Sequence, residues 1–114
     1  MTIQADIVTA LAGVASGRVY PQIAPENATY PLVNYRILNK APITTIHGTT
    51  LATDYTVVFE CWATTYSGAL TLAESVRTAI NASTLNKVET DEPGEEYDVQ
   101  ADSFMEPVYY VLMK

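Results

Sequence analysis

The chain has 114 residues, 48% of them hydrophobic, and a formal net charge of -7 at pH 7. This length suits one compact domain, and the composition is that of a folded globular protein, which excludes wholesale disorder. A broadly acidic surface repels nucleic acid, so the charge also argues against sequence-specific binding of DNA or RNA.

The first element is an amphipathic helix. Ile3, Ile7, Leu11 and Val14 recur at helical spacing, which predicts a helix from about residue 3 to 16. This segment lacks the uninterrupted apolar run of a secretory signal. The single cysteine, Cys61, excludes an intrachain disulfide, so we expect synthesis inside the cell.

A proline-rich segment, VYPQIAPENATYP at residues 19–31, follows the helix. Its three prolines lack backbone donors and favour extended or turn conformations, which predicts an ordered connecting loop. In residues 32–38 apolar side chains then alternate with Asn34 and Arg36. This alternation predicts a strand with one solvated face.

Residues 40–54, KAPITTIHGTTLATD, are rich in threonine and are interrupted by Pro42 and Gly48. Two structures fit this composition: a long mobile loop that orders on contact with a partner, or two short strands that meet at His47 and Gly48. The sequence leaves both alternatives open.

Residues 55–63 predict the second strand, because apolar and polar positions alternate. One face carries Tyr55, Val57, Phe59, Cys61 and Ala63. The other face carries Val58, Glu60 and Trp62. A face with these residues must be at least partly covered, either by another part of the chain or by another subunit.

A second helix follows at once, with Ser67 as its predicted N-cap. Its apolar stripe is expected to pack on the sheet and consists of Ala69, Leu72, Ala73, Val76, Ala79 and Ile80. Beyond it we expect a short strand at Val88, a turn at Pro93-Gly94, residues 97–101 running back against that strand, and a covered strand at 107–113. The predicted fold is a single α+β domain, residues 1–114, with a mainly antiparallel sheet of four to five strands and two helices packed on it.

No constellation of residues predicts a reaction. His47 is the only histidine and lies in a predicted exposed turn, and Cys61 lies inside a strand, where a thiol lacks the accessible, electropositive setting that activates it. The acidic residues near the C-terminus do not match the spacing of a calcium-binding loop. We therefore expect no catalytic site, no metal and no cofactor.

The order of motifs resembles a known family. A helix leads into GRVYPQIAPENATYPLVNYRI, a later strand and helix read FECWATTYSGALTLAESVRTAI, and an acidic segment precedes the last strand. This pattern is similar to the tail-completion family of long-tailed bacteriophages and prophages, also called tail terminators or tail-to-head joining proteins. The resemblance covers residues 3–113, although residues 40–54 and the DSFMEP stretch follow no strict family motif.

The resemblance implies a structural virion protein without enzymatic activity, made in the host cytoplasm and located at the head-proximal end of the tail. Its subunits would form a ring, typically of six, on the last ring of tail-tube protein, stop tube growth and present a surface to the head connector. DNA would pass through without sequence-specific binding, and no membrane would be involved.

Two sets of residues are candidates for these contacts. The predicted interface residues are His47, Val58, Glu60, Trp62, Tyr109 and Tyr110, because large aromatic residues are enriched where chains meet. The predicted acidic lining or rim of the channel consists of Glu89, Asp91, Glu92, Glu95 and Glu96.

Three alternative functions stay open. The chain could be another head-tail adaptor, or a small regulatory domain that binds a ligand or peptide in an aromatic-rich pocket. An enzyme that uses the acidic cluster or a pair of Cys61 and His47 is the least favoured alternative.

Overall fold

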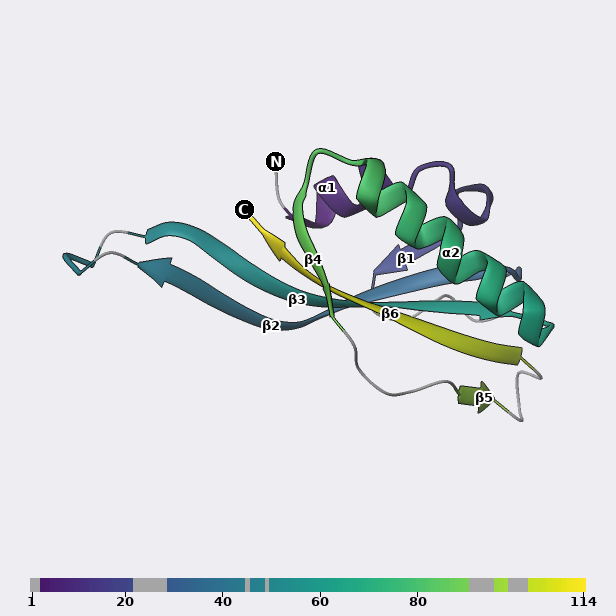
Figure 1. Ribbon diagram of the computed structural model, residues 1–114. Coiled ribbons are helices and arrows are strands. Elements are labelled where there is room, and N and C mark those ends of the chain that lie inside the picture. Colours follow the sequence, from purple (N-terminus) through teal and green to yellow (C-terminus); the bar gives the residue numbers. More distant parts are fainter. Residues whose placement is uncertain (1–2, 22–28, 45, 49, 91–95, 99–102) are drawn as a thin grey trace.

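A twisted sheet with two helices on one face forms the body of the protein (Figure 1). The computed structural model describes residues 3–21, 29–44, 46–48, 50–90, 96–98 and 103–114, with the backbone alone at residues 16, 50, 51 and 96–98. The helical segments are α1 (Ile3–Ala10), the 3-10 helix η1 (Val14–Gly17) and α2 (Tyr66–Ala82). The strands are β1 (Val19–Pro21), β2 (Leu32–Thr44), β3 (Thr50–Ala63), β4 (Asn86–Thr90), β5 (Glu96–Asp98) and β6 (Ser103–Met113).

The strand order is β1-β2-β3-β6-β4, and β5 pairs with β6. Every pairing is antiparallel except that of β1 with β2, which is parallel. The long strand β6 lies between β3 and β4, so the C-terminal segment is central to the sheet. This architecture confirms the predicted α+β fold with a mainly antiparallel sheet and two helices.

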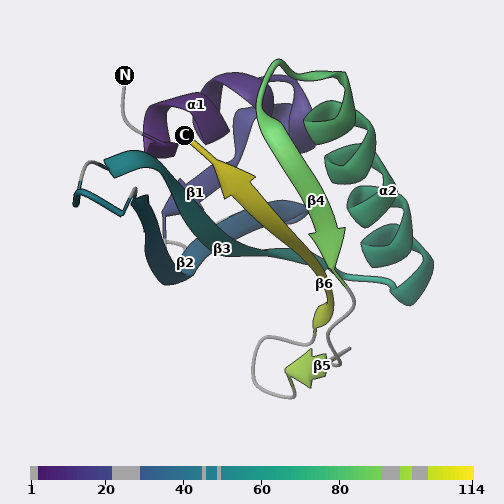
Figure 2. The same ribbon diagram turned by 60° about the vertical axis from the view of Figure 1, so that its left-hand side comes forward.

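The hydrophobic core lies between the helices and one face of the sheet (Figure 2). The predicted stripe of α2 is confirmed: five of its six residues are buried and Ala79 is partly buried. From the sheet, the core residues include Val33, Val57, Phe59, Val108 and Leu112. The alanines in the stripe let α2 lie close to β3 and β6, both of which it contacts.

The first helix is shorter than predicted. α1 ends at Ala10 and the chain tightens into η1, because Val14 donates its backbone N–H to the carbonyl of Leu11 at 2.9 Å, three residues back. Leu11 and Val14 are nevertheless buried, so the apolar pattern predicts the buried face correctly while the type of helix changes. Gly17 closes this segment with φ +83°, a conformation that favours glycine.

The segment after the helix was predicted as a loop and instead contains β1, which pairs in parallel with residues 33–35 of β2. Three residues are too few to give a periodic signal, so only the pairing partner reveals the strand.

Residues 40–44 and 50–54 form strands, with a turn at residues 46–48, and the structure therefore selects the two-strand alternative over the mobile loop. The register runs from Lys40 opposite Tyr55 to Thr44 opposite Thr50, after a bulge between Ile37 and Asn39. At the turn, Gly48 has φ +85°.

At the C-terminal end, the predicted strand at Val88 is confirmed as β4. The prediction that residues 97–101 pair with it is wrong for the described residues, because Tyr97 lies opposite Phe104 of β6. β4 and β5 occupy successive parts of the same edge of β6, at residues 109–113 and 103–105.

Candidate interaction surface

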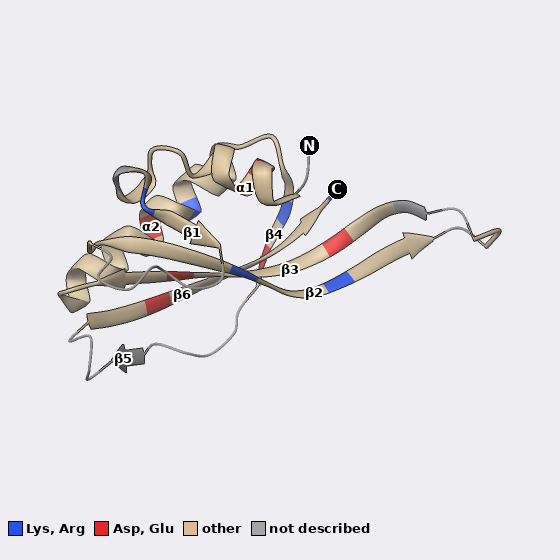
Figure 3. Ribbon diagram, turned by 180° about the vertical axis from the view of Figure 1, so that it is seen from behind, with Lys and Arg blue, Asp and Glu red and all other residues tan. Residues whose placement is uncertain are grey.

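The face of the sheet opposite the helices is the strongest candidate for contact with other proteins (Figure 3). We call it the helix-free face. Strand registers place Leu32, Asn34 and Arg36 of β2 beside Trp62, Glu60 and Val58 of β3 on this face. Met105, Pro107 and Tyr109 of β6 and Val88 of β4 continue it. Leu32, Asn34, Val58, Met105 and Pro107 are buried within the chain, whereas Arg36 and Val88 are exposed.

A polar network crosses the helix-free face from Trp62 to Arg36. The indole Nε1 of Trp62 donates to Oδ1 of Asn34 at 2.9 Å, and Nδ2 of Asn34 donates to Oε1 of Glu60 at 2.7 Å. Nε of Arg36 donates to the same Glu60 oxygen at 3.0 Å. Because Asn34 is buried and bonded on both sides, the network fixes the orientation of the indole.

Apolar side chains remain exposed next to this network. Val88 is 65% exposed and Met113 is 39% exposed. The partly buried Val111 lies directly opposite Val88, and Met113 and the partly buried Tyr109 lie two residues to either side of Val111 along β6. We call these four residues the apolar strip. Tyr109 also takes part in contacts within the chain, so its ring is partly held in place.

The structure separates the predicted interface residues into two groups. Val58 and Tyr110 are each only 1% exposed, and Tyr110 faces the helices, where its hydroxyl contacts Oδ1 of Asn81 at 3.2 Å. Their burial therefore needs no neighbouring subunit. Glu60, Trp62 and Tyr109 lie together on the helix-free face, while His47 lies in the exposed turn between β2 and β3.

Glu89 is the one member of the predicted acidic rim whose side chain the structure describes. Its carboxylate accepts from Nε of Arg77 at 2.6 Å, and Arg77 also contacts Glu74 at 2.6 Å. This ion pair ties β4 to α2 on the helix side of the sheet. Asp91, Glu92 and Glu95 lie outside the described residues, and Glu96 is described only by its backbone in β5.

Cys61 and His47 are far from forming a catalytic pair. Cys61 is fully buried in the core, and burial raises the pKa of its thiol far above the ordinary value. His47 lies beyond the other end of β3, in the turn before that strand.

The residues that the structure describes contain no group of three or more His, Cys, Asp or Glu side chains placed to hold a metal ion. Among the helices that the structure describes, none has the length and apolar character needed to cross a membrane.

Sequence reasoning missed Asn34, Val88 and Met113. Asn34 reads as a solvated strand position, and only its register opposite Glu60 reveals its role. Val88 was recognised as a strand residue, but its exposure depends on β4 forming the edge of the sheet. No local signal in the sequence could have shown this.

The fold and this surface together define a small α+β protein suited to contact with other protein chains. The chain belongs to the tail completion protein gp17 family, whose family model matches residues 4–104. No curated protein matches the chain. Membership makes it a phage tail protein with a structural, non-enzymatic role in tail assembly and contacts with other tail components.

Proposed function

We propose that this protein ends tail-tube growth as a ring of six identical subunits on the last ring of tail-tube protein. The opposite side of the ring then joins the head connector. Ring formation uses an interface between unlike surfaces of neighbouring subunits, since such contacts close into a ring when the rotation allows it.

The observation that carries this proposal is the apolar strip beside the Trp62 network. Apolar side chains exposed together on one face are typical of protein contact sites. Val88 lies on the edge strand β4 and Met113 at the end of β6, and both side chains are exposed, so another chain can reach them.

The charge of the chain supports the passage of DNA without binding. The six bases are spread over the chain: Arg18 after η1, Arg36 and Lys40 on β2, Arg77 on α2, Lys87 on β4 and Lys114 at the C-terminus (Figure 3). Arg36 and Arg77 are also paired with carboxylates. With a net charge of -7, an assembled ring repels the phosphate backbone instead of holding it.

The test is to polymerise purified tail-tube protein with and without this protein. We expect tubes of limited length with a ring at one end in electron micrographs, and a hexamer mass by light scattering for the detached cap. Tubes of unchanged length together with a strictly monomeric protein would overturn the proposal.

A further inference from the structure

The hairpin formed by β2 and β3 extends well beyond the helices (Figure 1). We call its outer part the arm: Asn39–Thr44, the turn Ile46–Gly48, and Thr50–Thr53. At its tip the side chain of Ile46 is 96% exposed. A fully exposed isoleucine at the end of a projecting hairpin contributes nothing to the chain's own core, so it is available to a partner.

At the opposite end of β3 the chain forms a recess. It lies between the segment that follows α1 and the first turns of α2, and has a volume of about 610 Å³. Its lining includes Ala15, Ala63, Thr64, Ser67, Thr71 and Leu72. The lining has no charged residue.

The arm and the recess are therefore separated by the whole of β3. A strand of fourteen residues spans about 45 Å at roughly 3.3 Å per residue, close to the longest dimension of the molecule, 52 Å. Because the arm points away from its own recess, it cannot fill that recess. A second copy placed end to end can.

We propose that Ile46 at the tip of one subunit's arm inserts into the recess between η1 and α2 of the next subunit. This inference rests on the proposed ring and supplies the contact between its neighbours. Tip and recess are unlike surfaces on one chain, so each subunit donates one arm and accepts another, which is the arrangement that closes rings.

The tip of the arm and the recess have compatible surface chemistry. The tip and the recess are both uncharged and rich in threonine or serine, so their contact removes no ion from water. Residues 38–53 also contain one lysine and no acidic residue in a chain whose net charge is -7. The arm is thus the part of one copy that an acidic second copy repels least.

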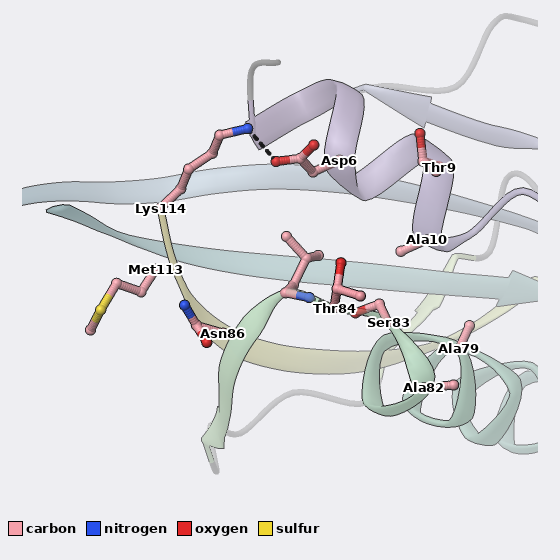
Figure 4. Close-up of a pocket in the computed structure, with 11 residues that line it drawn as sticks. Asp6, Thr9, Ala10, Ala79, Ala82, Ser83, Thr84, Asn86, Met113 and Lys114 are labelled. Atoms are coloured by element: carbon pink, nitrogen blue, oxygen red, sulfur yellow. Dashed lines mark hydrogen bonds and ion pairs between the residues drawn. The ribbon is translucent and has the colours of Figure 1, made fainter.

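A second recess lies between α1, the C-terminal end of α2 and β4, and fits the tip less well (Figure 4). The ion pair between Asp6 and Lys114 borders it. An isoleucine placed there would remove these charges from water, which costs free energy.

Cysteine cross-linking tests the contact directly. The native Cys61 is buried, so it should not form disulfides between subunits. The test variant can therefore carry two introduced cysteines, Ile46→Cys and Ser67→Cys. The matched control combines Ile46→Cys with Thr84→Cys, an exposed residue of the second recess. After mild oxidation in the presence of tail-tube protein, we expect disulfide-linked multimers up to the full ring for the first pair and not for the second.

Single variants give a non-covalent readout. Ile46→Ser should weaken subunit association about ten- to a hundredfold, the range expected for loss of one buried isoleucine side chain. Val8→Ser, which also shortens an exposed apolar side chain but lies on α1 away from the tip and the recess, should leave association unchanged. Neither change touches the core, so the circular dichroism of the monomer should be unaffected.

The outcomes separate this inference from the proposed function. Rings that form without a link between residues 46 and 67, or with a link to residue 84, would overturn the arm contact and leave the ring intact. A link from residue 46 to tail-tube protein alone would also overturn it. A protein that stays monomeric with tail-tube protein would overturn both proposals.

Discussion

The indole Nε1 of Trp62 and the side-chain oxygen of Asn34 lie 2.9 Å apart, on neighbouring strands and 28 residues apart in sequence. Asn34 also donates to Glu60, so one buried amide joins the aromatic ring to the carboxylate. The ring of Trp62 is therefore held against the sheet by a polar contact as well as by packing.

Replacing Asn34 by alanine should leave the Trp62 N–H and a Glu60 oxygen with one partner fewer. We expect the free energy of unfolding to fall by about 1–3 kcal/mol, the usual cost of a lost partner at a buried polar group. Urea unfolding followed by tryptophan fluorescence measures this. Asn39→Ala, at an exposed position of the same strand, is the control and should change stability by less than about 0.5 kcal/mol.

The buried thiol of Cys61 should react slowly or not at all with a thiol reagent at pH 8 in the folded protein, and rapidly in denaturant. The reason is that the thiol is fully buried and its pKa is raised by that burial. Rapid reaction without denaturant would show that β3 opens readily.

The same burial predicts a loss of stability in alkali. In the unfolded chain the thiol ionises near its ordinary pKa of 9.0, while in the folded chain it keeps its proton. The unfolded state therefore loses more protons as pH rises, and the free energy of unfolding falls above about pH 9. Cys61→Val should remove this component, whereas the raised pKa values of the buried tyrosines Tyr35 and Tyr110 leave a decline above pH 10 in both proteins.

The cap of α2 differs from the prediction and can be tested by a pair of substitutions. Thr65, in an extended conformation, accepts from the backbone N–H of Gly68 at 3.0 Å, and Ser67 lies inside the helix. Thr65→Ala should lower the free energy of unfolding by about 0.5–2 kcal/mol. Ser67→Ala should change it by less than about 0.5 kcal/mol. Equal effects in thermal unfolding would contradict this assignment.

The apolar strip should matter for assembly and little for the stability of the monomer. Val88→Asp changes a side chain that is largely exposed, so we expect a change in stability within about 0.5 kcal/mol. The capping of tail tubes should be lost, because a charge at an apolar contact must be taken out of water. Val8→Asp on α1, also exposed, is the control and should cap tubes normally.

Helices and strands were predicted correctly where a pattern of apolar residues extends over many consecutive positions. The stripe of α2 repeats over more than three turns and β3 alternates over many residues, so periodicity identifies both. The apolar run at 107–113 identifies β6 as a covered strand. The family resemblance, read from the segments before β2 and around α2, is confirmed by the family match over residues 4–104. The candidate surface was predicted in part, since Trp62 and Glu60 were placed on the second face of the sheet and lie there.

By itself the sequence determined an α+β fold, the faces of its long strands and the buried stripe of α2, because these depend on the spacing of apolar residues along one segment. Tertiary structure alone decided that β1 runs parallel to β2, that β5 joins β6, that Asn34 meets Trp62 and that the arm projects from the body. Each of these depends on which distant segments become neighbours, and that choice reflects the packing of the whole sheet instead of any local pattern.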